Sequence, residues 1–325
     1  MNMSIFRENF SHTHLGVRGR YDVNFFKPDV STMSDRALPS SEIELRIHLK
    51  INLRKDNDGS LAGPSRVWQW GNQNYHVAPW PDSEWNTFRT RVLDISRFWN
   101  NRFWLKLTDA GRELRAYKNI QKDVSVIETI NNRIVLVSPM IIRCAFSSEL
   151  SEHNAHYNLN AVYLVDPNGN PVASHENSGF ILRSDAVNID SGDVYGDYMI
   201  AHEIGHQLGL PHIGVETNHT PCTDAAPFWR REDHNARACY DSPIPDLNQN
   251  IMGSGTVVDW RNAVPWRVAL RDMTGMPINA YIVHTTRQTS TSFLPEGIYE
   301  FTPEWNAFNR SSLSNGTGFF NRLFN

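Results

Sequence analysis

Apolar and polar residues alternate strictly along one segment of the chain. In residues 43–53, isoleucine or leucine occupies every second position and a polar residue fills each position between them. Successive side chains of a β-strand point to opposite faces of a sheet, so this alternation predicts a strand with one buried face and one solvated face. The apolar positions are Ile43, Leu45, Ile47, Leu49, Ile51 and Leu53.

A helical period follows after a turn-rich stretch. Five large apolar residues recur three or four positions apart, which places them on one face of an amphipathic helix. They are Trp85, Phe88, Val92, Ile95 and Trp99. Asp82 or Ser83 is expected to cap this helix, because a short polar side chain can accept a hydrogen bond from the first backbone amides.

Short apolar runs predict further strands. Residues 133–146 and 159–165 are typical of buried strands, and the second run leads into a turn marked by proline and glycine. Residues 179–184 predict one more short strand. Together with the strand at 43–53, these segments supply the strands of a sheet.

Two more helices complete the pattern. One is expected to begin near Asp193 to Asp197, and the other carries four apolar residues on one face. These four are Trp266, Ala269, Leu270 and Met273. The order of strands and helices predicts an α+β fold in which helices pack on a mixed sheet. No pattern assigns an element to the polar tail from about residue 286.

Composition limits the possible partners. A chain of 325 residues that is 40% hydrophobic can bury a substantial core. A net charge of −4 gives no general attraction to nucleic acid or to anionic membranes. No stretch approaches the roughly 18 apolar residues of a membrane span, and the N-terminus lacks the features of a signal peptide. We therefore expect a soluble protein, with a monomer favoured, that has no nucleic-acid partner and no membrane span.

The segment 202–212, HEIGHQLGLPH, concentrates three histidines and a glutamate. On an α-helix His202 and His206 lie one turn apart on the same face, so both imidazoles can reach one ion. Zinc prefers four ligands and accepts imidazole nitrogen, so two histidines leave the site incomplete. Gly209 can end the helix and reverse the chain, which allows His212 to return toward the ion as the third ligand.

Glu203 follows the first ligand and is predicted to act on water rather than on the metal. With three protein ligands and one open position, a zinc ion lowers the pKa of its bound water toward about 7. A neighbouring carboxylate can take the proton of that water as it attacks a carbonyl and can pass it to the departing amine. The segment therefore predicts amide hydrolysis. A structural zinc site is disfavoured, because structural zinc usually takes cysteine as a ligand.

This spacing resembles the extended zinc motif of the metzincin metallopeptidases, His-Glu-x-x-His-x-x-Gly-x-x-His. Metzincins also carry a methionine in a tight turn beneath the metal, and here NIMGSG offers Met252 forty residues after His212. The resemblance implies one catalytic Zn²⁺ ion held by His202, His206 and His212. It further implies Glu203 as the catalytic residue, with Met252 as structural support.

The resemblance also implies an organisation of the chain. Residues 1–40 form an N-terminal segment, residues 41–285 a metzincin-like metallopeptidase domain, and residues 286–325 a C-terminal extension. Within the domain, an upper subdomain with a mixed twisted sheet and helices extends through the active-site helix to about residue 212. A smaller irregular lower subdomain, residues 213–285, ends in a helix.

Some positions depart from the patterns of metzincin subfamilies. Some members carry a tyrosine two residues after the methionine, where this chain has Ser254, and Ile213 follows the third histidine. Cys222 and Cys239, before DSPIP, give a faint similarity to the pappalysin-like branch. These two cysteines have sixteen residues between them. They predict a disulfide if the protein works in an oxidising place, and two free thiols otherwise.

The leading hypothesis is a zinc-dependent endopeptidase that acts on protein or peptide substrates. The alternatives are a catalytically inactive binding protein of this architecture and a zinc amidase that acts on small peptides. Because peptidase chemistry is combined with no signal peptide, we expect a secreted protein, or an injected bacterial effector or toxin, that uses another export route. A cytoplasmic location is the alternative.

Substrate recognition is predicted from the same resemblance. An extended peptide would lie along an edge strand between about Asn177 and Arg183. The segment after the methionine would form the wall of the pocket for the residue that follows the cleaved bond. An apolar wall favours an apolar residue there, because a charged one would lose its hydration without gaining a partner. The wall residues are Val257, Val258 and Trp260.

Overall fold

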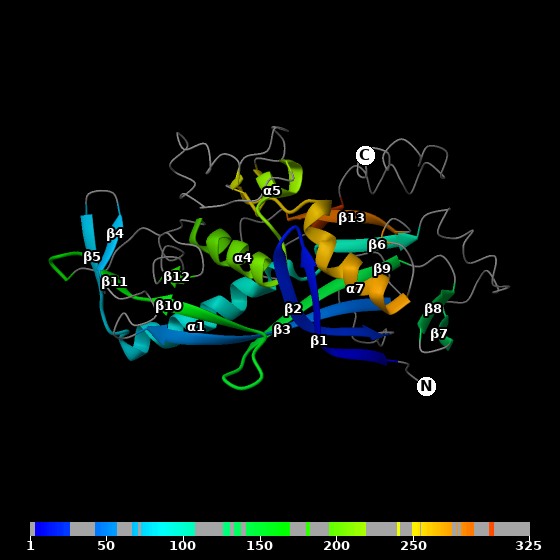
Figure 1. Cartoon of the computed structure of the whole chain (residues 1–325), viewed down its shortest axis with the longest axis horizontal. Helices are drawn as coiled ribbons and strands as arrows, with labels where there is room; N and C mark the ends of the chain where they lie inside the picture. The colour runs from blue at the N-terminus through cyan, green and yellow to red at the C-terminus, as the bar shows by residue number, and fades with distance from the viewer. Residues whose placement is uncertain are drawn as a thin grey trace.

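The structure is a computed structural model. It describes residues 4–26, 43–56, 67–70, 73–107, 126–130, 133–137, 141–169, 180–182, 195–218, 239–240, 249–253, 255–274, 278, 281–288 and 299–301. Figure 1 shows these parts of the chain as a large sheet with helices packed against it. Within them, no helix is long and apolar enough to cross a membrane.

Among the described residues, the large sheet contains nine strands. They are β1 (Ser4–His14), β2 (Val17–Phe26), β3 (Ile43–Asp56), β6 (Phe103–Leu107), β9 (Ile141–Leu150), β10 (Tyr157–Val162), β12 (Phe180–Leu182), β13 (Tyr281–Gln288) and β14 (Tyr299–Phe301). A smaller sheet contains β4 (Val67–Trp70), β5 (Gln73–Val77) and β11 (Leu164–Val165), and another contains β7 (Val126–Ile130) and β8 (Arg133–Val137).

β3 is the central strand, and its neighbours change along its length. β9 runs parallel to residues 43–51 of β3, and β2 runs antiparallel along residues 44–48 on the other side. β10 takes over that second side from Ile51 onward and runs parallel to β3. The chain therefore crosses β3 between β9 and β10, in residues 151–156, which we name the crossing segment. The large sheet is mixed, as expected for this α+β fold.

The helices cover the apolar side chains of the sheet. They are α1 (Asp82–Ser96), η2 (Arg97–Trp99), α4 (Tyr195–Gln207), α5 (Ile213–Asn218), η4 (Trp260–Ala263) and α7 (Val264–Thr274). α1 and α4 lie side by side, and α7 packs on β3 (Figure 1). Two buried tryptophans join the layers: the Trp99 indole donates to the Ala201 carbonyl at 3.0 Å, and the Trp266 indole donates to the Ala145 carbonyl at 2.9 Å.

The periodicity in the sequence predicted several of these strands and helices. The alternating segment is β3, and its inward residues from Leu45 to Ile51 are fully buried. The helix with Phe88, Val92 and Trp99 on its apolar face is α1 with η2. The Pro81 carbonyl accepts the first backbone hydrogen bond of this helix, so Pro81 occupies the N-cap position that was predicted for Asp82 or Ser83. The other predicted strands and helices are also present, and the described residues of the run 133–146 belong to β8 and β9. The burial of Ile95 lies outside the described residues.

Several elements had no signal in the sequence pattern. β1 and β2 lie in the N-terminal segment 1–40 and pair into the same sheet as β3. β13 extends across the domain boundary that was predicted after residue 285, and it pairs with β6. The metzincin-like division into upper and lower subdomains stays a prediction.

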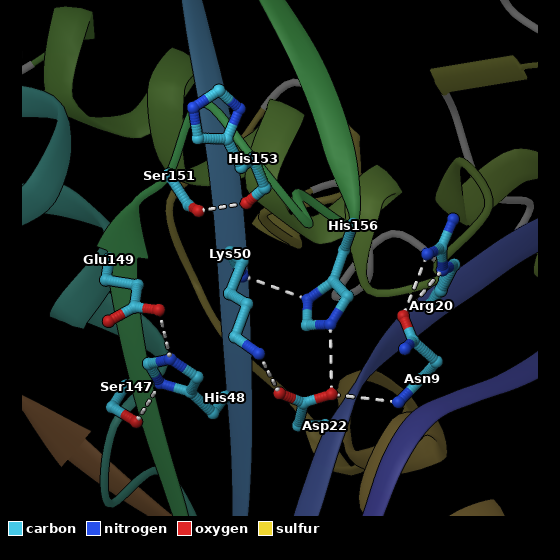
Figure 2. A network of polar contacts seen from close by, with 10 residues as sticks. All are labelled: Asn9, Arg20, Asp22, His48, Lys50, Ser147, Glu149, Ser151, His153 and His156. Carbon is cyan, nitrogen blue, oxygen red and sulfur yellow. Dashed lines mark hydrogen bonds and ion pairs between the residues drawn. The ribbon is translucent and has the colours of Figure 1, made fainter.

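A buried polar network fastens the crossing segment to the sheet (Figure 2). The Asp22 carboxylate on β2 accepts hydrogen bonds from the Asn9 amide at 2.8 Å and from His156 Nε2 at 3.1 Å, and it pairs with Lys50 Nζ at 2.8 Å. His156 Nδ1 accepts the Lys50 backbone N–H at 2.9 Å. This bond fixes the neutral tautomer with the proton on Nε2, so the ring joins β3 to β2.

The ionisation of this network couples it to pH. Burial raises the pKa of Asp22, but the hydrogen bonds from Lys50 and the Asn9 amide outweigh burial and hold that pKa below its ordinary value. Burial lowers the pKa of His156 by more than the nearby Asp22 carboxylate raises it. Both groups therefore bind protons more weakly in the folded chain than in the unfolded chain. Their contribution to stability is complete above the unfolded pKa and is lost as pH falls through the folded pKa.

We expect His156→Asn to destabilise the protein in a pH-dependent way. The asparagine side chain can still accept the Lys50 amide but leaves the buried Asp22 carboxylate one donor short, at a cost of about 2 kcal/mol near pH 7.5. The difference from wild type should shrink below pH 6.5, where the unfolded histidine takes up a proton. Denaturant unfolding at several pH values measures both effects.

The matched control is His153→Asn, because His153 lies in the same crossing segment with an exposed side chain. This variant should unfold like wild type across the pH range. If the loss of unfolding free energy in His156→Asn stayed constant down to pH 4.5, the pKa shift assigned to His156 would be wrong.

Candidate metal centre

Three histidine side chains converge at the C-terminal end of α4. One nitrogen from each of His202, His206 and His212 lies within 4.8 Å of the others, and the two Nε2 atoms of His206 and His212 are 3.1 Å apart. Bonds of 2.0 to 2.1 Å to a tetrahedral ion would separate two ligand nitrogens by about 3.4 Å. These three residues could therefore hold a metal ion.

Backbone carbonyls orient the rings of His202 and His206. His202 Nδ1 donates to the Ile251 carbonyl at 2.7 Å, and His206 Nδ1 donates to the Leu210 carbonyl at 2.8 Å. A proton on Nδ1 leaves the Nε2 lone pair of each ring available. Such bonds to the ring nitrogen remote from the metal are the usual way in which proteins fix a histidine ligand.

Burial also keeps the three imidazoles unprotonated. It is the main cause that lowers the pKa of His202 to about 3 and that lowers the pKa of His206. It lowers the pKa of His212 well below its ordinary value, with a further contribution from the two neighbouring histidines. All three imidazoles are therefore neutral at ordinary pH, which is the form that binds a metal.

The turn after α4 brings the third histidine back. The Leu210 amide donates to the Gly205 carbonyl at 3.0 Å and the Gly209 amide to the His206 carbonyl at 2.9 Å. This pair of bonds is a Schellman motif, and it places the residue with positive φ at Gly209, whose φ is +88°. The reversal predicted at Gly209 is confirmed.

The N-terminal hairpin of β1 and β2 supports this turn from outside. A Cβ atom at Gly209 would lie 2.7 Å from the Gly19 amide nitrogen, and one at Gly19 would lie 2.4 Å from the Leu208 carbonyl oxygen. The hairpin is also joined to α5, because His14 Nε2 and Glu216 Oε2 are 2.6 Å apart. Strand-to-turn contact this close is possible only between glycines.

Met252 packs against α4. A Cβ atom at Gly205 would lie 2.4 Å from the Met252 sulfur, so the thioether packs directly against the backbone between the two helical histidines. The Met252 amide donates to Asn250 Oδ1 at 2.8 Å, and the Met252 carbonyl accepts the Ile213 amide at 2.8 Å. Met252 is thus held between α4 and the residue that follows the third histidine.

Glu203 and the predicted pocket residues lie in different surroundings. Glu203 follows His202 on α4 and is buried. Val257 is 48% exposed, Val258 packs against the core, and the Trp260 ring lies 4.2 Å from the Arg261 guanidinium carbon. These three do not share one environment, so the apolar wall stays a prediction.

The other predicted substrate contact is an edge strand. The residues 180–182 form β12, whose only partner among the described strands is β10. One side of this short strand is therefore left without a strand neighbour in the part of the chain that the structure describes, as the prediction requires. Ser254, at the position where some metzincins carry tyrosine, lies outside the described residues.

Sequence reasoning missed an aromatic neighbour of the histidines. The Tyr240 ring centroid lies 4.2 Å from that of His212 and 6.2 Å from that of His202. The preceding residue, Cys239, is buried and disulfide-bonded, whereas Cys144 is a free, buried cysteine. Cys222, the third cysteine of the chain, lies outside the described residues. No spacing in the sequence links Tyr240 to the zinc motif.

Comparisons with protein-family models, with curated proteins and with solved structures find no match for this chain.

We expect Gly209→Ala to destabilise the protein far more than Gly169→Ala. Both glycines have positive φ, +88° and +84°, but only Gly209 faces another backbone, because a Cβ at Gly169 meets nothing within 4 Å. The φ cost alone is about 1 to 2 kcal/mol for alanine. Denaturant unfolding should show at least twice that loss for Gly209→Ala. Equal losses in the two variants would mean that the N-terminal hairpin does not press on the turn.

Proposed function

We propose that this protein is a zinc-dependent endopeptidase that hydrolyses peptide bonds of protein or peptide substrates. The observation that supports this most directly is the convergence of His202, His206 and His212 next to Glu203. The proposal also draws on the similarity of the segment 202–212 to the metzincin motif.

The donor set favours zinc. Three neutral imidazoles with no acidic residue or cysteine among the three convergent groups suit a borderline ion such as Zn²⁺, whereas magnesium and calcium prefer oxygen ligands. Among the described residues three groups converge, and three protein ligands would leave a fourth position open, as in catalytic rather than structural sites.

The chain's own residues supply the remaining roles. When bound, zinc supplies Lewis-acid chemistry: it polarises a carbonyl oxygen and makes a water molecule more acidic. Glu203 takes the proton from the attacking water and delivers it to the departing amine. His202, His206 and His212 stay neutral, because burial lowers the pKa of each imidazole.

The disulfide at Cys239 supports an oxidising place of action, since cytosolic thiols are usually kept reduced. We therefore propose that the protein is secreted or delivered, as an effector or toxin would be.

The first test concerns the metal. Protein prepared without added zinc should contain about one zinc per chain by elemental analysis, and His212→Ala should lower that content sharply because the site loses a third of its ligands. Native protein that lacks metal and still cleaves peptides would overturn the proposal.

The second test concerns Glu203. Glu203→Gln should lower peptide hydrolysis by a factor of about 100 or more while zinc content and unfolding stay unchanged, because it removes a base but no ligand. Glu84→Gln on α1 is the matched control and should retain wild-type turnover. Cleavage sites in a peptide library, identified by mass spectrometry, provide the rate measurement and the specificity.

The library also separates the alternatives. Cuts inside long peptides support an endopeptidase, whereas cleavage limited to dipeptides and tripeptides would indicate a small-peptide amidase. Zinc binding with no cleavage of any member would indicate a binding protein.

A further inference from the structure

Tyr240 lies beside the three histidines, although it belongs to a different segment of the chain. Its ring centroid is 4.2 Å from that of His212, with the two ring planes inclined at 47°. It is also 6.2 Å from the centroid of His202, with the planes inclined at only 28°. One aromatic ring therefore lies against two of the three ligands, although it comes from a segment 28 residues beyond His212.

Two contacts hold the backbone of Tyr240 in place. The neighbouring residue, Cys239, is fully buried and disulfide-bonded, which ties this point of the chain to another. On the other side, a Cβ atom at Gly253 would lie 2.7 Å from the Tyr240 carbonyl oxygen. Only a glycine beside Met252 lets the Tyr240 backbone approach this closely. The disulfide at Cys239 and the close backbone contact with Gly253 therefore fix the Tyr240 ring beside the histidines.

The three histidines come from two parts of the chain. His202 and His206 lie on α4, and each donates from Nδ1 to a backbone carbonyl. His212 lies beyond the turn at Gly209, where the Tyr240 ring packs against it. A planar ring at van der Waals distance restricts rotation of the imidazole about its side-chain bonds.

We propose that Tyr240 is a positioning residue for His212, and that the Cys239 disulfide holds it there. The inference rests on the proposed metal centre, because it assigns Tyr240 a role in how tightly that centre holds zinc. The contact that carries this role is the one between the Tyr240 ring and the His212 imidazole. The segment around Cys239 thereby couples metal retention to an intact disulfide.

The test compares Tyr240→Leu with Tyr240→Phe by zinc affinity, measured in competition with a chromophoric chelator. Removing a partner outside the ligand set typically weakens metal binding by about 10- to 100-fold. Tyr240→Leu should therefore lose about 10-fold in affinity, and Tyr240→Phe should stay within about threefold of wild type, because it keeps the ring. With cobalt in place of zinc, the visible absorption bands should change in Tyr240→Leu and be restored in Tyr240→Phe.

Trp85→Leu controls for the loss of a half-buried ring. Trp85 packs on Trp80 and Phe88, within the α1 face and remote from the motif in sequence, so this variant should lower the melting temperature and leave zinc affinity unchanged. Equal zinc affinity in Tyr240→Leu and wild type would overturn the inference, as would an equal loss in the Phe and Leu variants.

A second variant tests the role of the Cys239 disulfide without changing the Tyr240 ring. The sequence has three cysteines and Cys144 is free and buried, so the double substitution Cys222→Ser and Cys239→Ser removes the Cys239 disulfide and both other thiols that could bind zinc. It should weaken zinc binding severalfold while Tyr240 is intact, and unchanged affinity would overturn the role of the disulfide. Zinc affinity is measured independently of peptide hydrolysis, so the two proposals can fail separately. Zinc binding without hydrolysis would refute only the proposed peptidase. Hydrolysis together with an unchanged zinc affinity in Tyr240→Leu would refute only this inference.

Discussion

The chain reversal at Gly209 is the constraint on which the candidate metal centre depends. In a continuing helix His212 would lie about 9 Å along the axis from His206, too far for both to reach one ion. The positive φ of Gly209 instead returns His212 until its Nε2 lies 3.1 Å from that of His206. A side chain at this position would meet the Gly19 backbone as well as a strained φ. The position of His212 therefore depends on the N-terminal hairpin as well as on its own turn.

Strand β2 connects that turn to the rest of the molecule. Gly19 contacts the turn after α4, and two residues later the Tyr21 hydroxyl donates to the Pro265 carbonyl of α7 at 3.0 Å. Asp22 then anchors the crossing segment through His156 at 3.1 Å. Three residues of β2 thus contact the turn after α4, helix α7 and the crossing segment. Residues 17–26 belong to the folded unit of the site and do not merely precede it.

The sequence predicted what depends on local spacing and missed what depends on distant contacts. Alternation identified β3, and the three-to-four spacing identified α1 and the helix that carries His202 and His206, because those patterns reflect burial on one face. β2 was missed because its buried set includes Asp22, a charge that breaks the apolar pattern and is stable there only through partners on β3 and in the crossing segment. The position of Tyr240 was missed for the same reason, since tertiary contacts alone bring it to the histidines.

The turn that contains Met252 contacts each of the three ligand segments. The Ile251 carbonyl accepts the proton of His202 Nδ1, and the Met252 sulfur packs against Gly205, one residue before His206. The Met252 carbonyl accepts the amide of the residue after His212. A flexible, unbranched side chain suits this place, because it must fill the space under a helix backbone without a branch at Cβ. The turn therefore acts as one support for all three histidines, so a change at Met252 would be transmitted to the whole ligand set rather than to a single ring.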